Sequence, residues 1–310
     1  MHIVIPGALP PASVATDLSR EIGQHSPTLI GLFERLMPRT VPLHPAQTGC
    51  TPAEYFMLAQ HGWVSETGSR AVGALASLQA EITSHANTGW VAQMCVMSIG
   101  NEHVSLALPN ELDLTREESA RLMNDVLTLT PPFGFTLTPI DNKSISHAWR
   151  VAFDEPIDYV SISPQAVRGI GVTDWWPQHP STRLWRKWLN EVQMSWYNHP
   201  INQDRMDRGL LAINGLWLYG GGPGWTPQEP VPEILTLTHL EHAHAQGNWS
   251  DWIHALRSLE HELIKHPQIS RLILLGDARM VVLTNEKRNW WTQLFGPRKQ
   301  LWSRWWNPPA

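Results

Sequence analysis

The architecture of this chain can be inferred from residues 189–222, LNEVQMSWYNHPINQDRMDRGLLAINGLWLYGGG. The segment begins inside a helical pattern that is expected to end near Asn198, before His199-Pro200. It then contains a short apolar run, Leu216–Tyr219, which is typical of a buried strand and leads into three glycines. A helix that alternates with a buried strand is characteristic of α/β proteins. The apolar stripe of the helix, which we expect to face the core, consists of Trp185, Trp188, Leu189, Val192 and Trp196.

The polar residues of this segment have the chemistry of an anion site. Asn202, Arg205 and Arg208 supply amide and guanidinium donors of the kind that hold carboxylates and phosphates. Gly220–Gly222 would let backbone N–H groups approach a ligand closely. The alternative is structural: Asn202 and Asn214 tie down turns, and the glycines only permit a tight crossover. Neither a GxGxxG nor a GxxxxGK[ST] motif is present, so the glycines alone are not specific.

The order of these residues resembles an element of the archaeal-type cofactor-independent phosphoglycerate mutases. In that family a helix is followed by His-Pro-Val-Asn, an Arg, a Gly, an Asn, a buried strand and an Arg-Gly-Ala-Gly turn. This chain has Tyr219 where the family turn has its Arg, so a guanidinium that could hold a phosphate is missing there. The ligand site that the resemblance implies consists of His199, Asn202, Arg205, Asn214, Gly220, Gly221 and Gly222.

A second resemblance covers the same segment together with Ile5–Pro11, IPGALPP, and Asn190–Met194. These stretches are similar to a small proteobacterial family that is described as phosphoglycerate mutase-like or as regulator of pathogenicity factors type E. The resemblance implies a bacterial protein with a regulatory role.

The phosphoglycerate mutase resemblance implies the chemistry of the alkaline phosphatase superfamily, in which two divalent metals, manganese or zinc, are held by several Asp and His ligands. Here the first apolar run, His2–Ile5, is followed by Pro6-Gly7-Ala8 without an acid. Asp277 follows a late strand, but no His follows it. Loss of these ligands would remove the catalyst, because the two metals stabilise both the attacking and the leaving oxygen.

We therefore expect a non-catalytic phosphoglycerate mutase-like protein with a binding or regulatory role and no cofactor. A small phosphorylated metabolite is the ligand that the segment suggests. Two alternatives stay open: an active metal-dependent phosphomutase or phosphatase that acts on such a metabolite, and a structural module for protein interaction.

The rest of the chain predicts an α/β fold with a mostly parallel sheet flanked by helices, a remnant of the alkaline phosphatase fold. Antiparallel hairpins are added in the N-terminal half, one of them around Gly100-Asn101 within Trp90–Leu108. One domain over residues 1–310 is expected, or sub-domains 1–155 and 156–310, with a linker candidate at Gly220–Pro232. Capping boxes predict helices that start at Thr51 and Thr115.

Composition narrows the class of protein. The formal net charge of -5 leaves no basic footprint, which makes nucleic acid an unlikely partner. No run of 18 apolar residues occurs, so no membrane span is expected. The two cysteines, Cys50 and Cys95, have no CxxC spacing, and the N-terminus lacks the basic region of a signal peptide. These observations predict a cytoplasmic protein.

Histidine and tryptophan are the remaining candidates for function. His239, His242 and His244 cluster in HLEHAH, and we expect them to be solvated or to cap a helix. The alternative is that this stretch is irregular and holds a transition metal. Near the C-terminus, Trp290, Trp291, Trp302, Trp305 and Trp306 are interleaved with basic residues, among them Arg304. This segment is expected to dock over the core, or else to bind a protein partner, since Trp and Arg are favoured interface anchors. Single-stranded nucleic acid is a third alternative, since indoles can stack on bases. The candidate partner surface is Trp302, Arg304, Trp305 and Trp306.

Overall fold

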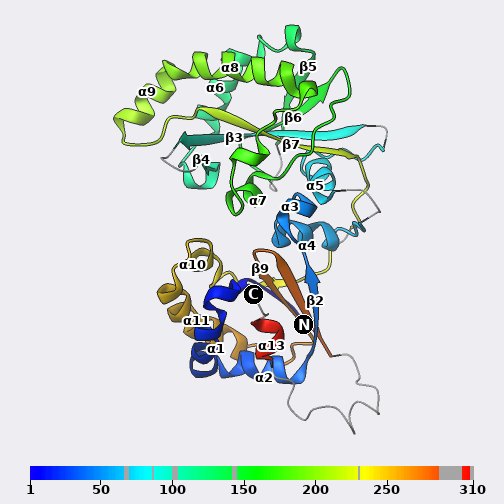
Figure 1. Ribbon diagram of the computed structural model, residues 1–310, viewed down its shortest axis with the longest axis vertical. Coiled ribbons are helices and arrows are strands. Elements are labelled where there is room, and N and C mark those ends of the chain that lie inside the picture. Colours follow the sequence, from blue (N-terminus) through cyan, green and yellow to red (C-terminus); the bar gives the residue numbers. More distant parts are fainter. Residues whose placement is uncertain are drawn as a thin grey trace. The chain divides into compact units, whose positions relative to one another are not determined.

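The computed structural model describes residues 1–65, 70–85, 87–99, 104–141, 145–229, 231–285 and 302–307. The chain divides into two compact units (Figure 1): unit 1 is Met1–His44 with Pro230–Ala310, and unit 2 is Pro45–Glu229. The boundary at residue 230 falls inside the expected linker, Gly220–Pro232. The break expected at residue 155 lies instead within unit 2, so unit 1 is assembled from both ends of the chain.

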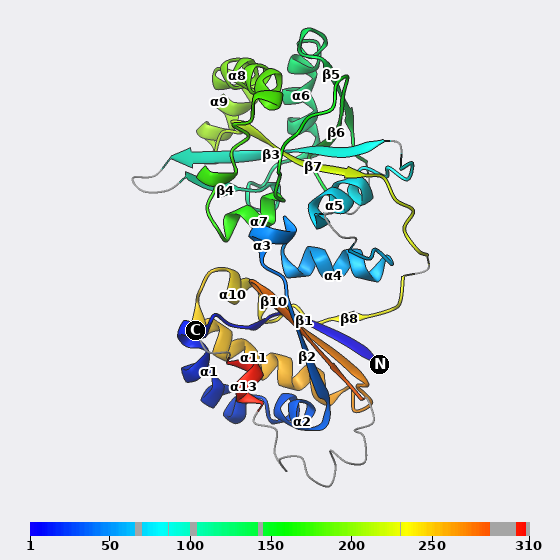
Figure 2. The ribbon, with the colours of Figure 1, turned by 45° about the vertical axis from the view of Figure 1, so that its right-hand side comes forward.

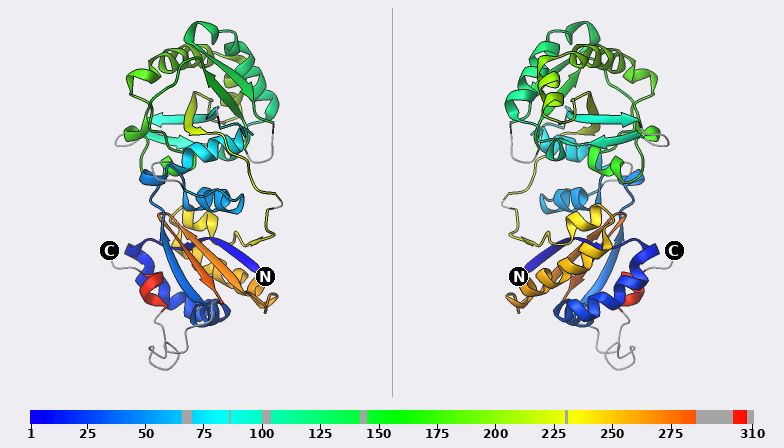
Figure 3. Two further views of the ribbon diagram at one scale, coloured as in Figure 1. Left: turned by 90° about the vertical axis from the view of Figure 1, so that its right-hand side faces the viewer. Right: turned by 90° about the vertical axis from the view of Figure 1, so that its left-hand side faces the viewer.

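Unit 1 is built on a five-stranded sheet of order β2-β10-β9-β1-β8. Figures 2 and 3 show how strands from both ends of the chain, blue and orange, lie side by side in this sheet. Its elements are β1 (His2–Leu9), α1 (Ala12–His25), α2 (Pro27–Arg35), β2 (Met37–Pro42), β8 (Leu235–Thr236), α10 (Glu241–Ala245), α11 (Trp249–Ile264), β9 (Arg271–Gly276), β10 (Arg279–Thr284) and α13 (Ser303–Trp306).

The expectation of a mostly parallel sheet was wrong. β1 pairs in parallel with β8 and β9, but β10 is antiparallel to both β9 and β2. The reason is the connection: only Asp277 and Ala278 separate β9 from β10. Two residues can close a hairpin, whereas a parallel crossover needs a dozen or more.

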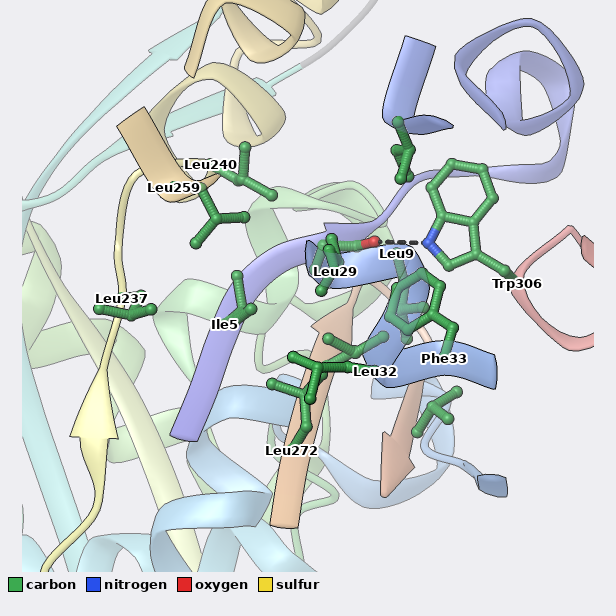
Figure 4. Close-up of a cluster of buried hydrophobic side chains, with 14 of the residues drawn as sticks. Ile5, Leu9, Leu29, Leu32, Phe33, Leu237, Leu240, Leu259, Leu272 and Trp306 are labelled. Carbon is green, nitrogen blue, oxygen red and sulfur yellow. Dashed lines mark hydrogen bonds between the residues drawn. The ribbon is translucent and has the colours of Figure 1, made fainter. Parts of the chain in front are cut away.

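The core of unit 1 lies between this sheet and α1, α2 and α11. Alternate residues of the strands point the same way, so Ile3 and Ile5 of β1 and Leu272 of β9 contribute to one face. Figure 4 shows Ile5 and Leu272 in the same apolar cluster as Leu259 and Phe33 from the helices. Trp306, close to the end of the chain, also lies in this cluster and is fully buried.

Unit 2 is built on an antiparallel sheet in which β3 pairs with β4, β6 and β7, and β5 pairs with β6. The pairs β3–β4 and β5–β6 confirm the expected hairpins; the turn residues Gly100 and Asn101 lie outside the described part of the chain. Its elements are α3 (Pro45–Thr48), α4 (Pro52–Gln60), α5 (Ala71–Gln79), β3 (Thr88–Ile99), β4 (Val104–Ala107), α6 (Arg116–Leu127), β5 (Phe135–Pro139), β6 (Ala148–Phe153), α7 (Pro164–Arg168), α8 (Arg183–Tyr197), α9 (Pro200–Asp207) and β7 (Gly215–Pro223), with single 3-10 turns between them.

Two apolar clusters, which draw on alternate residues of β3 and β7, make up the core of unit 2. One cluster joins the sheet to α4, α5 and α7, and the other joins it to α6 and α8. The five residues of the predicted α8 stripe are all buried in the second cluster, as expected.

Both predicted capping boxes are confirmed. The Thr51 hydroxyl accepts from the Glu54 N–H at 3.1 Å, and the Glu54 carboxylate accepts from the Thr51 N–H at 2.8 Å. Thr115 and Glu118 repeat the pattern at the start of α6 with the same two distances. Each box satisfies N–H groups that would otherwise lack partners at a helix start.

Candidate functional site

His199 lies at the corner between α8 and α9, where it caps α9. Its Nδ1 accepts from the Ile201 N–H at 3.1 Å, so its Nε2 carries the proton and donates to the Asp125 carboxylate at 2.9 Å. The ring is 7% exposed. His199 therefore joins the α8–α9 corner to α6.

Asn202 is buried in α9 and connects α8 to the segment before β7. Its amide Nδ2 donates to the carbonyls of Trp196 and Ile213, both at 2.8 Å, and its Oδ1 accepts from the Ile213 N–H at 2.8 Å. Both amide protons are thus bonded within the protein. A ligand could use them only by breaking these bonds.

Arg205 is fully buried, with 0% of its surface exposed. Nε donates to the Leu211 carbonyl at 2.9 Å, and Nη2 donates to the Leu112 carbonyl. Nη1 donates to the Glu118 carboxylate at 3.1 Å and, at 3.4 Å, to the Asp113 carbonyl. The guanidinium therefore fastens α9 to the start of α6 and to the loop before it.

Glu118 is the acidic partner of this corner. Burial alone would raise its pKa, but hydrogen bonds from the Thr115 backbone and Arg208, with the charge of Arg205, hold the pKa below the ordinary value. The carboxylate thus carries four partners: the Thr115 N–H and hydroxyl, Arg205 and Arg208. The charge that would have met a phosphate at Arg205 is already neutralised by a side chain of the protein.

Asn214, the residue before β7, adds a further pair of hydrogen bonds to the pairing of β7 with β3. Its Oδ1 accepts from the Met97 N–H and its Nδ2 donates to the Met97 carbonyl, both at 2.8 Å. The side-chain amide thereby imitates the backbone of a neighbouring strand.

Gly220–Gly222 form a bulge where β7 pairs with the start of β3. Gly220 pairs with Trp90 and Gly222 with Gly89, so Gly221 is the extra residue. A Cβ on Gly220 would lie 2.2 Å from the Gly89 carbonyl oxygen, and one on Gly222 would lie 2.7 Å from the Cα of Gly73 in α5. The glycines therefore allow close backbone packing. The N–H of Gly220, the first of the three glycines, donates to the Ser161 hydroxyl at 2.9 Å and is therefore not free for a ligand.

Tyr219, which stands where the resemblance would place an Arg, is also bonded internally. Its hydroxyl donates to Oε1 of Gln79 at 2.6 Å, and burial raises its pKa well above the ordinary value. The side chain stays a neutral phenol and offers no charge to a ligand.

The structure brings together only part of the predicted site. His199, Asn202 and Arg205 share the corner of α6, α8 and α9, whereas Gly220–Gly222 lie at the far end of β7. Asn214 and Gly220 are six positions apart along the strand, which corresponds to roughly 20 Å at about 3.3 Å per residue. One small phosphorylated metabolite could not contact both groups.

A second set of polar residues meets in unit 1, at the carboxyl end of β1. The strand leaves its register with β9 between Ile5 and Leu9, and Gly7 adopts a positive φ of 72°. Three ring nitrogens bond to the carbonyls that this irregularity frees: Trp252 to Gly7 at 2.8 Å, Trp306 to Ala8 at 3.0 Å and His244 to Leu9 at 3.3 Å. The indoles therefore complete the backbone hydrogen bonding at the end of the strand.

His244 is the residue whose environment the sequence did not reveal. We expected HLEHAH to be solvated or capping, but the His244 side chain is only 7% exposed. Its Nδ1 lies 3.6 Å from the carboxylate of Asp277, which follows β9. A His and an Asp thus meet beside Gly7. Within the described residues, however, no group of three or more His, Cys, Asp or Glu is placed to hold a metal ion.

The C-terminal segment 302–307 packs against unit 1. Arg279 donates to the carbonyls of Trp305 and Trp306 at 2.9 and 2.7 Å. The ring of Phe33 packs against the rings of Trp302 and Trp305, with centroids 5.6 and 5.0 Å apart. Figure 4 shows Trp306 beside Phe33, with its indole nitrogen bonded to the end of β1. Arg304 is exposed. The remaining members of the predicted aromatic patch, Trp290 and Trp291, lie outside the described residues.

Comparisons with known proteins were made with family models, curated proteins and solved structures. No protein-family model and no curated protein matches the chain. Among solved structures, it is similar to the cofactor-independent phosphoglycerate mutase from Thermoplasma acidophilum DSM 1728, at 12% identity and a TM-score of 0.39, over 98% of this chain and 94% of that one. A likeness of this degree does not assign an activity to the chain. None of the helices in the described ranges combines the length and apolar character that a membrane span requires.

Proposed function

We propose that this chain is a binding protein that does not catalyse metal-dependent phosphoryl transfer, and that its phosphoglycerate mutase-like segment has a structural role. A regulatory role in the bacterial cytoplasm, which the proteobacterial resemblance implies, is part of this proposal. The observation that supports it most is the state of Arg205. A guanidinium with no exposed surface, bonded to three carbonyls and to Glu118, has no free donor pair for a phosphate.

The donor set at the end of β1 also favours this proposal. A two-metal centre needs several carboxylate and imidazole ligands for each ion. His244 and Asp277 supply two ligands beside Gly7, and His244 already donates to the Leu9 carbonyl. These residues do not fit a centre that would hold two metals.

The test is an activity assay with metal supplied in excess. The purified full-length chain is incubated with Mn²⁺ or Zn²⁺ and offered 3-phosphoglycerate or p-nitrophenyl phosphate. We expect no turnover above that of the variants His244→Ala and Asp277→Ala, which remove the two candidate ligands. Metal-dependent turnover by the unmodified chain that either substitution abolishes would overturn the proposal.

A further inference from the structure

The C-terminal segment 302–307 is attached to unit 1 from outside its sheet. The strands of that sheet, β2, β10, β9, β1 and β8, pair with one another and not with the segment. The hydrogen bonds of the segment go to three separate elements: from Trp306 to Ala8 of β1 at 3.0 Å, from Asn307 to Thr16 of α1 at 2.7 Å, and from Arg279 of β10 to the carbonyls of Trp305 and Trp306. The segment could therefore leave without breaking a strand pair.

Trp306 is the anchor of the segment. Its side chain is fully buried, and Figure 4 shows its indole in the apolar cluster of unit 1, beside Phe33. The ring packs against Trp252 and Trp302, with centroids 6.5 and 5.8 Å apart. A buried tryptophan whose indole N–H is also bonded is a frequent anchor of bound peptides. The segment is thus held in the manner of a peptide ligand.

The docked segment carries two energetic costs that opening would remove. Arg279 is half-buried, and burial lowers the pKa of its guanidinium below the ordinary value. Its acceptors are neutral carbonyls, and no carboxylate of the described residues pairs with it. The indole nitrogen of Trp305 is buried without a hydrogen-bond partner among those residues. Water would solvate both groups once the segment left, so docking is weaker than the buried area alone would make it.

The segment lies at the carboxyl end of β1, a strand that pairs in parallel with β8 and β9. Open α/β sheets bind ligands outside the carboxyl ends of such strands. The body of unit 1 supplies the donors for two carbonyls here, Trp252 for Gly7 and His244 for Leu9. Of these three neighbouring carbonyls, that of Ala8 takes its donor from the segment. We therefore expect the end of the strand to stay ordered, and to become accessible, when the segment opens.

We propose that residues 302–307 form a strap that closes the carboxyl end of β1 and opens as a unit while the sheet stays folded. Opening frees the site of Trp306 for a separate peptide of the same kind, whose tryptophan donates to the Ala8 carbonyl. Access to this end of the sheet is thereby coupled to the strap. The inference involves neither Arg205 nor a metal centre, so it stands apart from the proposed function.

The first test follows the indole protons of the native full-length chain, with isotope-labelled tryptophan, by NMR after transfer into deuterated water. Trp252 is the internal control, because its buried indole also bonds to a carbonyl at the end of β1. We expect the Trp306 indole proton to exchange at least about tenfold faster than that of Trp252, with a weaker dependence on low concentrations of urea. A rate for Trp306 no faster than that for Trp252 would mean that the segment opens only when unit 1 unfolds, and would overturn the proposal.

A substitution in β10 should loosen the strap without changing it. Arg279→Gln removes the guanidinium that bonds to the carbonyls of the strap and should speed exchange of the Trp306 indole about tenfold, while Trp252 keeps its rate. Arg39→Gln, at an exposed position of β2, is the matched control and should change neither rate. If Arg279→Gln speeds both indoles equally, or neither, the strap does not open as a separate unit.

The second test supplies the strap as a separate peptide. A fluorescein-labelled peptide with the sequence of residues 299–310 is titrated against the full-length Trp306→Ala variant, and binding is measured by fluorescence anisotropy. We expect saturable binding in the micromolar range, and binding to the native chain at least about tenfold weaker, because its own strap competes. The same peptide with alanine in place of Trp306 should also bind at least about tenfold more weakly to the variant.

Equal binding of the two peptides would overturn the proposal, as would the absence of binding to a variant that circular dichroism shows to be folded. If the variant does not fold, indole exchange in the native chain decides alone.

Discussion

Replacing Arg205 by leucine separates a structural role of the phosphoglycerate mutase-like segment from a ligand-binding role. The substitution fills part of the same space in α9 with an apolar side chain but removes all five guanidinium N–H donors. In the native protein these donors serve the carbonyls of Leu112, Asp113 and Leu211 and the carboxylate of Glu118. A ligand-binding arginine would leave stability nearly unchanged when it is removed, whereas this one should not.

The expected loss follows from the partners left behind. Breaking a buried ion pair by removal of one partner destabilises a protein by about 3–5 kcal/mol. Glu118 keeps its bonds to the Thr115 N–H and to Arg208, which places the loss near the lower end, at about 3 kcal/mol. The loss of stability should not be smaller than this, because the carbonyls of Leu112 and Leu211 also lose their donors.

The assay is urea unfolding of the full-length chain followed by circular dichroism, together with hydrogen exchange of the peptides that cover residues 200–223. Arg205→Leu should lower the midpoint and speed exchange in α9 and β7. Arg208→Leu is the matched control, because Arg208 contacts the same carboxylate but its side chain is 46% exposed, and it should have a smaller effect. The structural role would be refuted if Arg205→Leu lowered the free energy of unfolding by less than about 1 kcal/mol and, at the same time, abolished phosphate binding measured for the native chain.

Three further predictions concern other parts of the molecule. Acid should destabilise unit 2, because the pKa of Glu118 is lower in the folded than in the unfolded protein. The stability that this carboxylate contributes is fully present above the unfolded pKa of about 4.3, and it is lost as the pH falls through the folded pKa. Glu118→Gln should therefore make the urea midpoint depend less on pH. Gly222→Ala should destabilise by about 1–3 kcal/mol in urea unfolding, because its Cβ meets the α5 backbone, whereas Gly23→Ala, with open space around it in α1, should be neutral or stabilising. Trp306→Ala should destabilise by about 3–5 kcal/mol and make unit 1 more sensitive to limited proteolysis, and unchanged proteolysis would contradict the docking of residues 302–307.

Sequence patterns predicted those features whose partners lie close along the chain. The capping boxes at Thr51 and Thr115 join residues three positions apart, and the α8 stripe follows from the helical period alone. β2 was not anticipated, because Met37–Pro42 is an edge strand with two prolines and a half-exposed pattern, which obscures the alternation that marks a strand.

The candidate ligand site shows where sequence reasoning stops. The residue types were informative, since Asn202, Arg205 and Asn214 all make charged or amide hydrogen bonds. Their acceptors were not visible: Arg205 meets Glu118 across 87 positions, and Asn214 meets Met97 across 117. A guanidinium donates equally well to a phosphate, a carbonyl or a carboxylate, so its role depends on which acceptor the fold brings near.

By itself, the amino-acid sequence predicted the starts of α4 and α6, the β3–β4 and β5–β6 hairpins and the buried tryptophan face of α8, and it shows no acid directly after the first apolar run. These follow from interactions over a few residues, whose energies do not depend on the rest of the chain. Only the tertiary structure decided that strands from both ends of the chain share one sheet, and that Trp306 bonds to Ala8 from 298 positions away. Contacts between distant segments are set by the packing of the whole core, and no local pattern encodes them.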